Sequence, residues 1–96
     1  MAQTLLQPEI IESGVVDGRW MVVIFNNELT AYEDVVRMLL VATGCGTQEA
    51  LTETWEAHHF GSAPVHFADR DECEVVATMI GTIGVRTVVR PEWNEA

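Results

Sequence analysis

Three polar side chains in a row, Asn26, Asn27 and Glu28, follow an apolar run and precede a predicted helix. Another polar group, His58, stands near the end of a second predicted helix. Amide and carboxylate oxygens and a neutral imidazole nitrogen are all hydrogen-bond acceptors. Convergent acceptors suit a group with three donors, such as a primary ammonium. Each residue also has an ordinary interpretation, as a turn or capping residue or as a hydrogen-bonded core histidine.

Other chemistries have weaker support. Cys45 lies between two glycines with no histidine nearby in sequence, and no serine has a nucleophile-elbow context. Cys45 and Cys73 fit no metal-ligand spacing, and His58 and His59, adjacent on a helix, point about 100° apart. We therefore expect no catalytic residue, no metal and no cofactor. A small enzyme or metal protein that uses His58, His59 and a cysteine stays open as an alternative.

Apolar periodicity indicates the elements that position these side chains. Strands are predicted over 19–25, 62–68 and 85–90, and helices over 30–43, 47–59 and from 69 to about 83. The order β-α-α-β-α-β predicts one compact α+β domain, residues 19–96, with a three-stranded antiparallel sheet and three helices on one face. Residues 1–18 have no clear period and are expected to form a flexible N-terminal arm.

Two helix patterns carry further expectations. Thr30 and Glu33 have the spacing of a capping box at the start of the first helix. In the second helix Leu51, Trp55 and His58 recur at i, i+4 and i+7, which predicts an apolar stripe and places His58 at the interior or its rim.

Composition excludes several classes of partner. The 96 residues carry 15 acidic and five basic side chains, all arginine, for a formal net charge of −10. Such a field repels nucleic acid and anionic membranes and attracts cationic ligands. No apolar run approaches the ~20 residues of a membrane span, and the first residues lack the basic region of a signal peptide. We therefore expect a cytoplasmic protein with free thiols.

Three segments resemble the ClpS family of protease adaptors over residues 20–92. They are VVIFNNELTAYEDVV, EAHHFGSAPVHF and VRTVVRPE. The first looks like the family's strand, polar loop and Thr-x-x-Glu helix start. The second is similar to its helix end with histidine and glycine before a strand, and the third to its last strand.

The resemblance implies a non-enzymatic adaptor for N-degrons, that is, for proteins marked for degradation by their N-terminal residue. Asn26, Asn27 and His58 would hold the substrate's α-amino group. The first side chain, which is Leu, Phe, Tyr or Trp with Ile and Val as further candidates, would enter a pocket. By position this hydrophobic pocket is lined by Glu28, Thr30, Tyr32, Val35, Ala57 and Val85. The adaptor would dock on the N-terminal domain of the ClpA unfoldase, and its arm would help to deliver substrate for ClpP proteolysis.

Three positions depart from the family pattern. Asn27 replaces an acidic residue, Tyr32 stands where methionine is common, and Val76 stands where a lysine often faces the unfoldase. Asp71 and Val76 are the candidate residues for the unfoldase interface. The departures support an alternative, a ClpS-like peptide-binding or protein-interaction module with altered N-terminal specificity and no unfoldase docking. A module of this kind that has lost amine recognition altogether, through Asn27, is also open.

Overall fold

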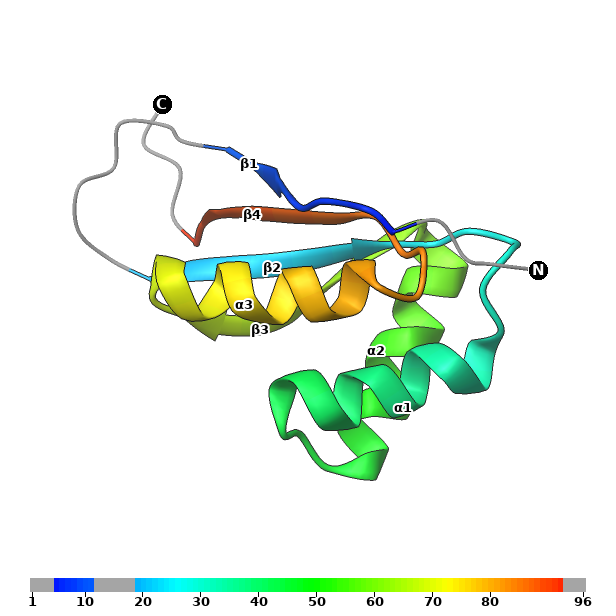
Figure 1. Ribbon diagram of the computed structural model, residues 1–96. Helices are drawn as coiled ribbons and strands as arrows, with labels where there is room; N and C mark the ends of the chain where they lie inside the picture. Colours follow the sequence, from blue (N-terminus) through cyan, green and yellow to red (C-terminus); the bar gives the residue numbers. More distant parts are fainter. Residues whose placement is uncertain (1–4, 12–18, 93–96) are drawn as a thin grey trace.

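A computed structural model describes residues 5–11 and 19–92 of the chain (Figure 1). In chain order the elements are β1 (Glu9–Ile10), β2 (Trp20–Phe25), α1 (Tyr32–Thr43), α2 (Thr47–Phe60), β3 (Ser62–Ala68), α3 (Arg70–Gly81) and β4 (Thr87–Pro91). From β2 onward, the order and approximate bounds agree with those predicted from the sequence. Within the described residues, no helix is long and apolar enough to cross a membrane.

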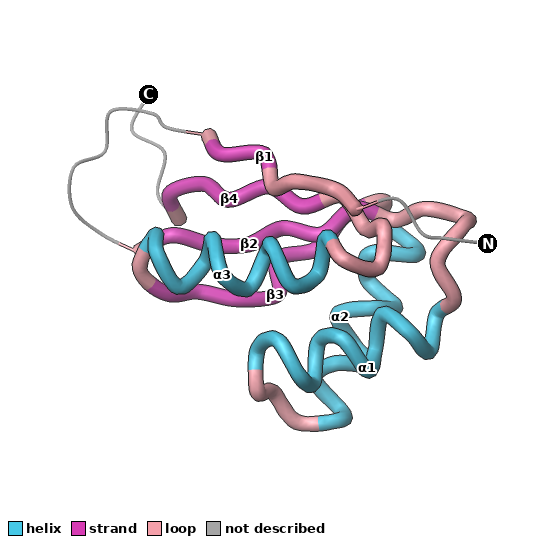
Figure 2. Tube along the Cα trace, viewed as in Figure 1, coloured by secondary structure: helices cyan, strands magenta, loops and turns pink. Residues whose placement is uncertain are grey.

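The four strands form one mixed sheet in the order β1-β4-β2-β3 (Figure 2). β2 lies between β3 and β4 and is antiparallel to both. β3 is an edge strand, which suits Pro64 because proline cannot donate to a neighbouring strand. The register shifts between Val22 and Val23, so that this strand pair contains a bulge.

The predicted three-stranded antiparallel sheet is wrong, because Glu9 and Ile10 add a fourth strand parallel to β4. The backbone N–H of Ile11 donates to Val89 O at 2.8 Å and that of Leu6 donates to Gly81 O at 3.0 Å. A Cβ at Gly81 would clash with the carbonyl oxygen of Leu6, so glycine permits this close approach. Two residues of strand are too few for an alternating pattern. The rest of the predicted arm, 1–4 and 12–18, lies outside the described residues.

All three helices contribute to a single core against the sheet. The buried side chains of this core come from both layers: Val22, Ile24, Leu39, Ala50, Ala57, Ala63, Val65, Cys73, Val76, Ala77, Ile80, Val85 and Val89. Val22 and Ile24 alternate along β2, as expected for a strand with one face against helices. Asp69 caps α3, with its Oδ1 accepting from Glu72 N–H at 2.8 Å.

The buried face of α2 differs from the predicted one. Ala50, Thr54 and Ala57 are buried, whereas Leu51 and Trp55 are 40% and 46% exposed and His58 is also exposed. The helix packs against β3 and α1, and small side chains allow this close approach. The predicted inward position of Leu51 and Trp55 is therefore wrong, because the short packing distance favours small side chains over larger apolar ones, whereas His58 lies at the rim of a cavity.

Candidate functional site

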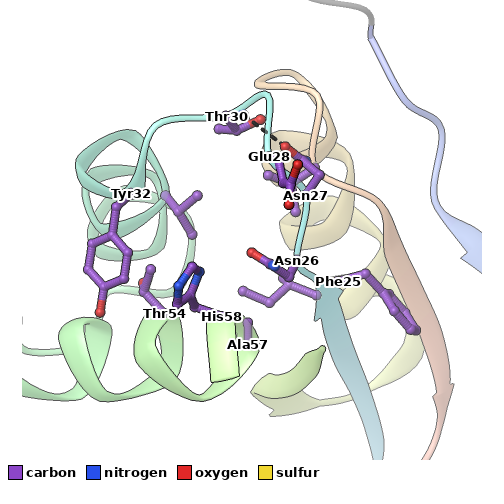
Figure 3. Close-up of a pocket in the computed structure, with 12 residues that line it drawn as sticks. Phe25, Asn26, Asn27, Glu28, Thr30, Tyr32, Thr54, Ala57 and His58 are labelled. Atoms are coloured by element: carbon purple, nitrogen blue, oxygen red, sulfur yellow. Dashed lines mark hydrogen bonds between the residues drawn. The ribbon is translucent and has the colours of Figure 1, made fainter. Parts of the chain in front are cut away.

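A cavity of about 300 Å³ opens where the end of β2, the loop before α1 and the end of α2 meet (Figure 3). Its lining residues are Ile24, Phe25, Asn26, Asn27, Glu28, Thr30, Tyr32, Val35, Thr54, Ala57, His58 and Val85. All nine residues predicted from the sequence for amine and side-chain binding lie in this set. The structure therefore brings together positions up to 59 residues apart in the chain.

Backbone hydrogen bonds fix the mouth of the cavity. Asn26 N–H donates to Gly61 O at 2.9 Å, and Phe25 N–H donates to Arg86 O at 3.0 Å. Gly61 has a φ of 92°, which favours glycine, and it ends α2 three residues after His58. The end of β2 is thus tied to the end of α2, and Asn26 is held near His58.

Asn27 organises the loop instead of facing the cavity with a free acceptor. Its Oδ1 accepts from the N–H groups of Leu29 and Thr30, both at 2.8 Å. Its Nδ2 donates to Gly84 O at 3.1 Å. An amide oxygen has two lone pairs, and both are engaged here. The expectation that Asn27 holds an ammonium directly is therefore not supported by the geometry.

Thr30 has a different role from the predicted helix cap. Its hydroxyl donates to Ile83 O at 3.0 Å, and the N-cap of α1 is Ala31, without a side-chain cap. The predicted capping box is therefore wrong. Thr30 and Asn27 both tie the loop to the turn at residues 83–84, and this turn leads directly to Val85 in the cavity wall.

Asn26 and His58 are two of the polar groups available at the cavity. Both side chains are exposed, and neither makes a hydrogen bond to any other described residue. Figure 3 shows the Asn26 amide and the His58 ring on facing sides of the cavity. A single small cationic group between them would find acceptors on both sides.

The interior of the cavity is mainly apolar. Ile24, Ala57 and Val85 are buried and Val35 is half-buried. The Thr54 hydroxyl donates to Ala50 O at 2.7 Å, so it offers no free donor to a ligand. Tyr32 forms one wall, with its hydroxyl 3.4 Å from Leu51 O.

Sequence reasoning missed Ile24, Phe25 and Thr54 as cavity residues. Ile24 and Phe25 directly precede Asn26, and Thr54 lies one helical turn before His58. Their proximity in sequence to predicted site residues could have identified them as cavity residues. Thr54 was missed because the predicted stripe assigned the wrong face of α2 to the interior.

The family model for ATP-dependent Clp protease adaptor protein ClpS matches residues 16–84, more than half of the chain. The chain belongs to the ClpS family. Among solved structures, that of Agrobacterium tumefaciens ClpS2 bound to L-phenylalaninamide is similar, with a TM-score of 0.73 and 25% sequence identity. The similarity covers 78% of this chain and 98% of that one. No curated protein sequence gives a significant match.

The two residues predicted for the unfoldase interface of this ClpS-family chain differ in their exposure to solvent. Asp71 is exposed at the start of α3, whereas Val76 is 3% exposed and belongs to the core. A core side chain cannot meet a partner on the surface, so the prediction for Val76 is wrong. Its neighbour Val75 is 61% exposed.

One further cluster in this ClpS-family domain contains groups that bind metals in other proteins. Among the described residues, Cys45, Glu49 and Glu53 place one possible ligand atom each within 4.8 Å of one another. Burial, the charge of Glu49 and a hydrogen bond with it, and the charge of Glu56 raise the pKa of Glu53 to about 8. The raised pKa favours the neutral form of the Glu53 carboxyl at pH 7.

Proposed function

We propose that this ClpS-family chain binds the free α-amino group and bulky hydrophobic first side chain of N-degron peptides. The observation that carries the proposal is the pairing of Asn26 and His58, two polar side chains without a hydrogen-bond partner in the described chain, at the mouth of an apolar cavity. Polar acceptors at the mouth of a cavity with apolar side chains inside match a ligand that carries an ammonium next to a hydrocarbon side chain.

The Asn26 amide oxygen and a neutral His58 nitrogen would accept two of the three ammonium hydrogens. Glu28 is exposed at the cavity and the formal net charge is −10, so the local potential favours a cation. This potential offsets part of the charge that the family's usual acidic residue supplies at position 27. The proposal thus assigns amine recognition to Asn26 and His58 and loop organisation to Asn27.

The cavity volume supports recognition of one large side chain. About 300 Å³ lies at the low end of ligand pockets, which suits a single Leu, Phe, Tyr or Trp side chain and also admits Ile or Val. A charged first side chain would lose its hydration against the apolar side chains of Ile24, Val35 and Val85. L-phenylalaninamide, the ligand of the similar ClpS2 structure, has a free amine and an aromatic side chain, which is the same combination.

In this proposal the chain is a non-enzymatic cytoplasmic adaptor that delivers its ligands to a ClpA-type unfoldase and ClpP. Family membership supports this step. Because Val76 lies in the core, docking would depend on exposed residues such as Asp71. A ClpS-fold peptide-binding module without unfoldase docking is the alternative.

Fluorescence anisotropy with paired peptides tests the binding step. Peptides that begin with Leu, Phe, Trp, Val or Arg are compared with N-acetylated copies of the same sequence. We expect free hydrophobic N-termini to bind and acetylated or Arg-initiated peptides to bind at least tenfold more weakly. Equal affinity for free and acetylated peptides would refute amine recognition.

Degradation of a fluorescent protein that begins with Leu, by purified ClpA and ClpP with and without this chain, tests delivery. Acceleration that requires the free N-terminus supports the adaptor function. Amine-dependent binding without acceleration would assign the chain to the alternative, a binding module without docking.

A further inference from the structure

The outer surface of α2 carries large apolar side chains that the core does not use. Beside it, Tyr32 at the start of α1 is 42% exposed, and Leu51, Trp55 and Phe60 of α2 are 40%, 46% and 72% exposed. Together with His59 we call these residues the aromatic shelf. Scattered exposed apolar residues are normal, but a contiguous group often marks an interaction site.

Contacts between rings hold the shelf in a defined arrangement. Trp55 stacks on His59 with ring centroids 4.0 Å apart and an interplanar angle of 25°. Phe60 meets Trp55 edge-on, with ring centroids 5.8 Å apart. The Nδ1 of His59 is 3.1 Å from Trp55 O, and since a carbonyl can only accept, this nitrogen donates. The rings therefore present a largely preformed surface.

The shelf is continuous with the amine-binding cavity. A second hollow, of about 280 Å³, is lined by Tyr32, Gln48, Leu51, Thr52 and Trp55. Tyr32 lines both hollows and separates them. His58, at the cavity mouth, has its ring centroid 5.5 Å from that of His59 in the shelf.

We propose that the aromatic shelf is a second subsite, which binds a large apolar or aromatic side chain at position 2 or 3 of the peptide. This inference rests on the proposed function, because the first residue must occupy the cavity. An extended chain advances about 3.3–3.6 Å per residue, so one or two residues beyond the amine reach the shelf. The resulting ligand class is an N-degron with a hydrophobic first residue and a second apolar side chain close behind it.

The position of the second hollow favours the next residues of the bound peptide as its occupant. It is small, it adjoins the cavity through the shared residue Tyr32, and its lining is mainly apolar, with the uncharged polar side chains of Gln48 and Thr52. A separate protein partner or a second copy of the chain would cover the shelf without any need for this continuity. Both of these occupants are outcomes of the test.

The experiment measures whether the affinity gained from a second aromatic residue in the peptide depends on Trp55 of the protein. Four peptides with free N-termini are used, which begin Phe-Ala-Ala, Phe-Trp-Ala, Phe-Ala-Trp and Phe-Asp-Ala and are otherwise identical. On the unmodified chain we expect Trp at position 2 or 3 to improve affinity about three- to tenfold over Ala. Trp55→Ala and Leu51→Ala should each reduce this advantage while leaving Phe-Ala-Ala affinity unchanged. Phe67→Ala, which removes an exposed aromatic residue of β3, is the matched control and should preserve the advantage.

An equal Trp advantage in the unmodified chain and in both shelf variants would overturn the subsite. Sedimentation velocity in which the unmodified chain dimerises and Trp55→Ala does not would assign the shelf to a second copy and also overturn it. The Phe-Ala-Ala peptide and its acetylated form separate the two proposals. If only the free form binds, the proposed function stands, whether or not the shelf is a subsite. If neither form binds, or if both bind with equal affinity, both proposals fail.

Discussion

The ring of His58 lies edge-on to the ring of Tyr32, with centroids 6.3 Å apart and planes at 77°. One of these residues belongs to the end of α2 and the other to the start of α1. This contact joins the wall of the side-chain cavity to the group that we propose as an ammonium acceptor. Selection of the first side chain and recognition of the amine are therefore expected to influence each other.

Replacement of Tyr32 tests this connection. Tyr32→Met should leave amine dependence intact but change the ranking among Leu, Phe and Trp, because a flexible side chain replaces a rigid ring. We expect changes of about 1–3 kcal/mol in the relative binding free energies of first residues, the range for hydrophobic pocket contacts. The ranking is measured by anisotropy with free and acetylated peptides. An unchanged ranking in both Tyr32→Met and Tyr32→Ala would show that this residue does not select the ligand.

Asn26 and Asn27 are adjacent but should respond differently to replacement. Asn27→Ala removes three hydrogen bonds of the loop, so we expect a loss of about 1–3 kcal/mol in the free energy of unfolding. Asn26→Ala removes no hydrogen bond within the described chain, and its unfolding free energy should change by less than about 0.5 kcal/mol. Its peptide affinity should nevertheless fall. Urea unfolding and anisotropy on both variants check this, and equal effects on stability would contradict the division of roles.

His58→Ala should weaken binding of a free Leu or Phe peptide by about 1–2 kcal/mol, since one acceptor for the ammonium is lost. His58→Gln keeps an acceptor oxygen and should recover part of the affinity. His66→Gln is the control, because His66 lies outside the cavity and pairs with Glu72 at 2.6 Å. Normal peptide affinity in His58→Ala would show that this histidine does not contribute to binding.

The raised pKa of Glu53 predicts a pH-dependent stability. An ordinary carboxyl at 4.5 is raised to about 8 by burial and by Glu49. Between these values the folded chain binds more protons than the unfolded chain, so this group's contribution falls as pH rises from about 4.5 to 8 and then levels off. Glu53→Gln should raise the unfolding free energy at pH 7 by about 1–2 kcal/mol after allowance for solvent screening.

Urea unfolding from pH 5 to 8 measures this effect, with Glu33→Gln as control because Glu33 is exposed at the start of α1. The decline with pH should be smaller in Glu53→Gln than in the unmodified chain. Parallel pH profiles in the unmodified chain and Glu53→Gln would mean that Glu53 ionises normally.

Local patterns in the sequence were sufficient for the helices, for the central strands and for Asn26 and His58 as candidate acceptors, whereas the full set of predicted pocket residues came from the resemblance to ClpS. A strand that ends just before Asn26 and a glycine that ends α2 after His58 are short-range signals. Chain connectivity then brings their ends together. The motif similarity to ClpS captured the same positions, and the family match agrees with it.

Only tertiary contacts decided what several of those residues do. Asn27 and Thr30 each donate one side-chain hydrogen bond to the turn at residues 83–84, more than 50 positions away. Glu9 and Ile10 form a strand because β4 offers its edge to them, and α2 places Trp55 outside because only small residues fit against its neighbours. Side-chain type and spacing thus determined which residues meet at the site. The partners of each polar group and the face that each helix buries depended on distances between segments remote in the chain, which no local pattern contains.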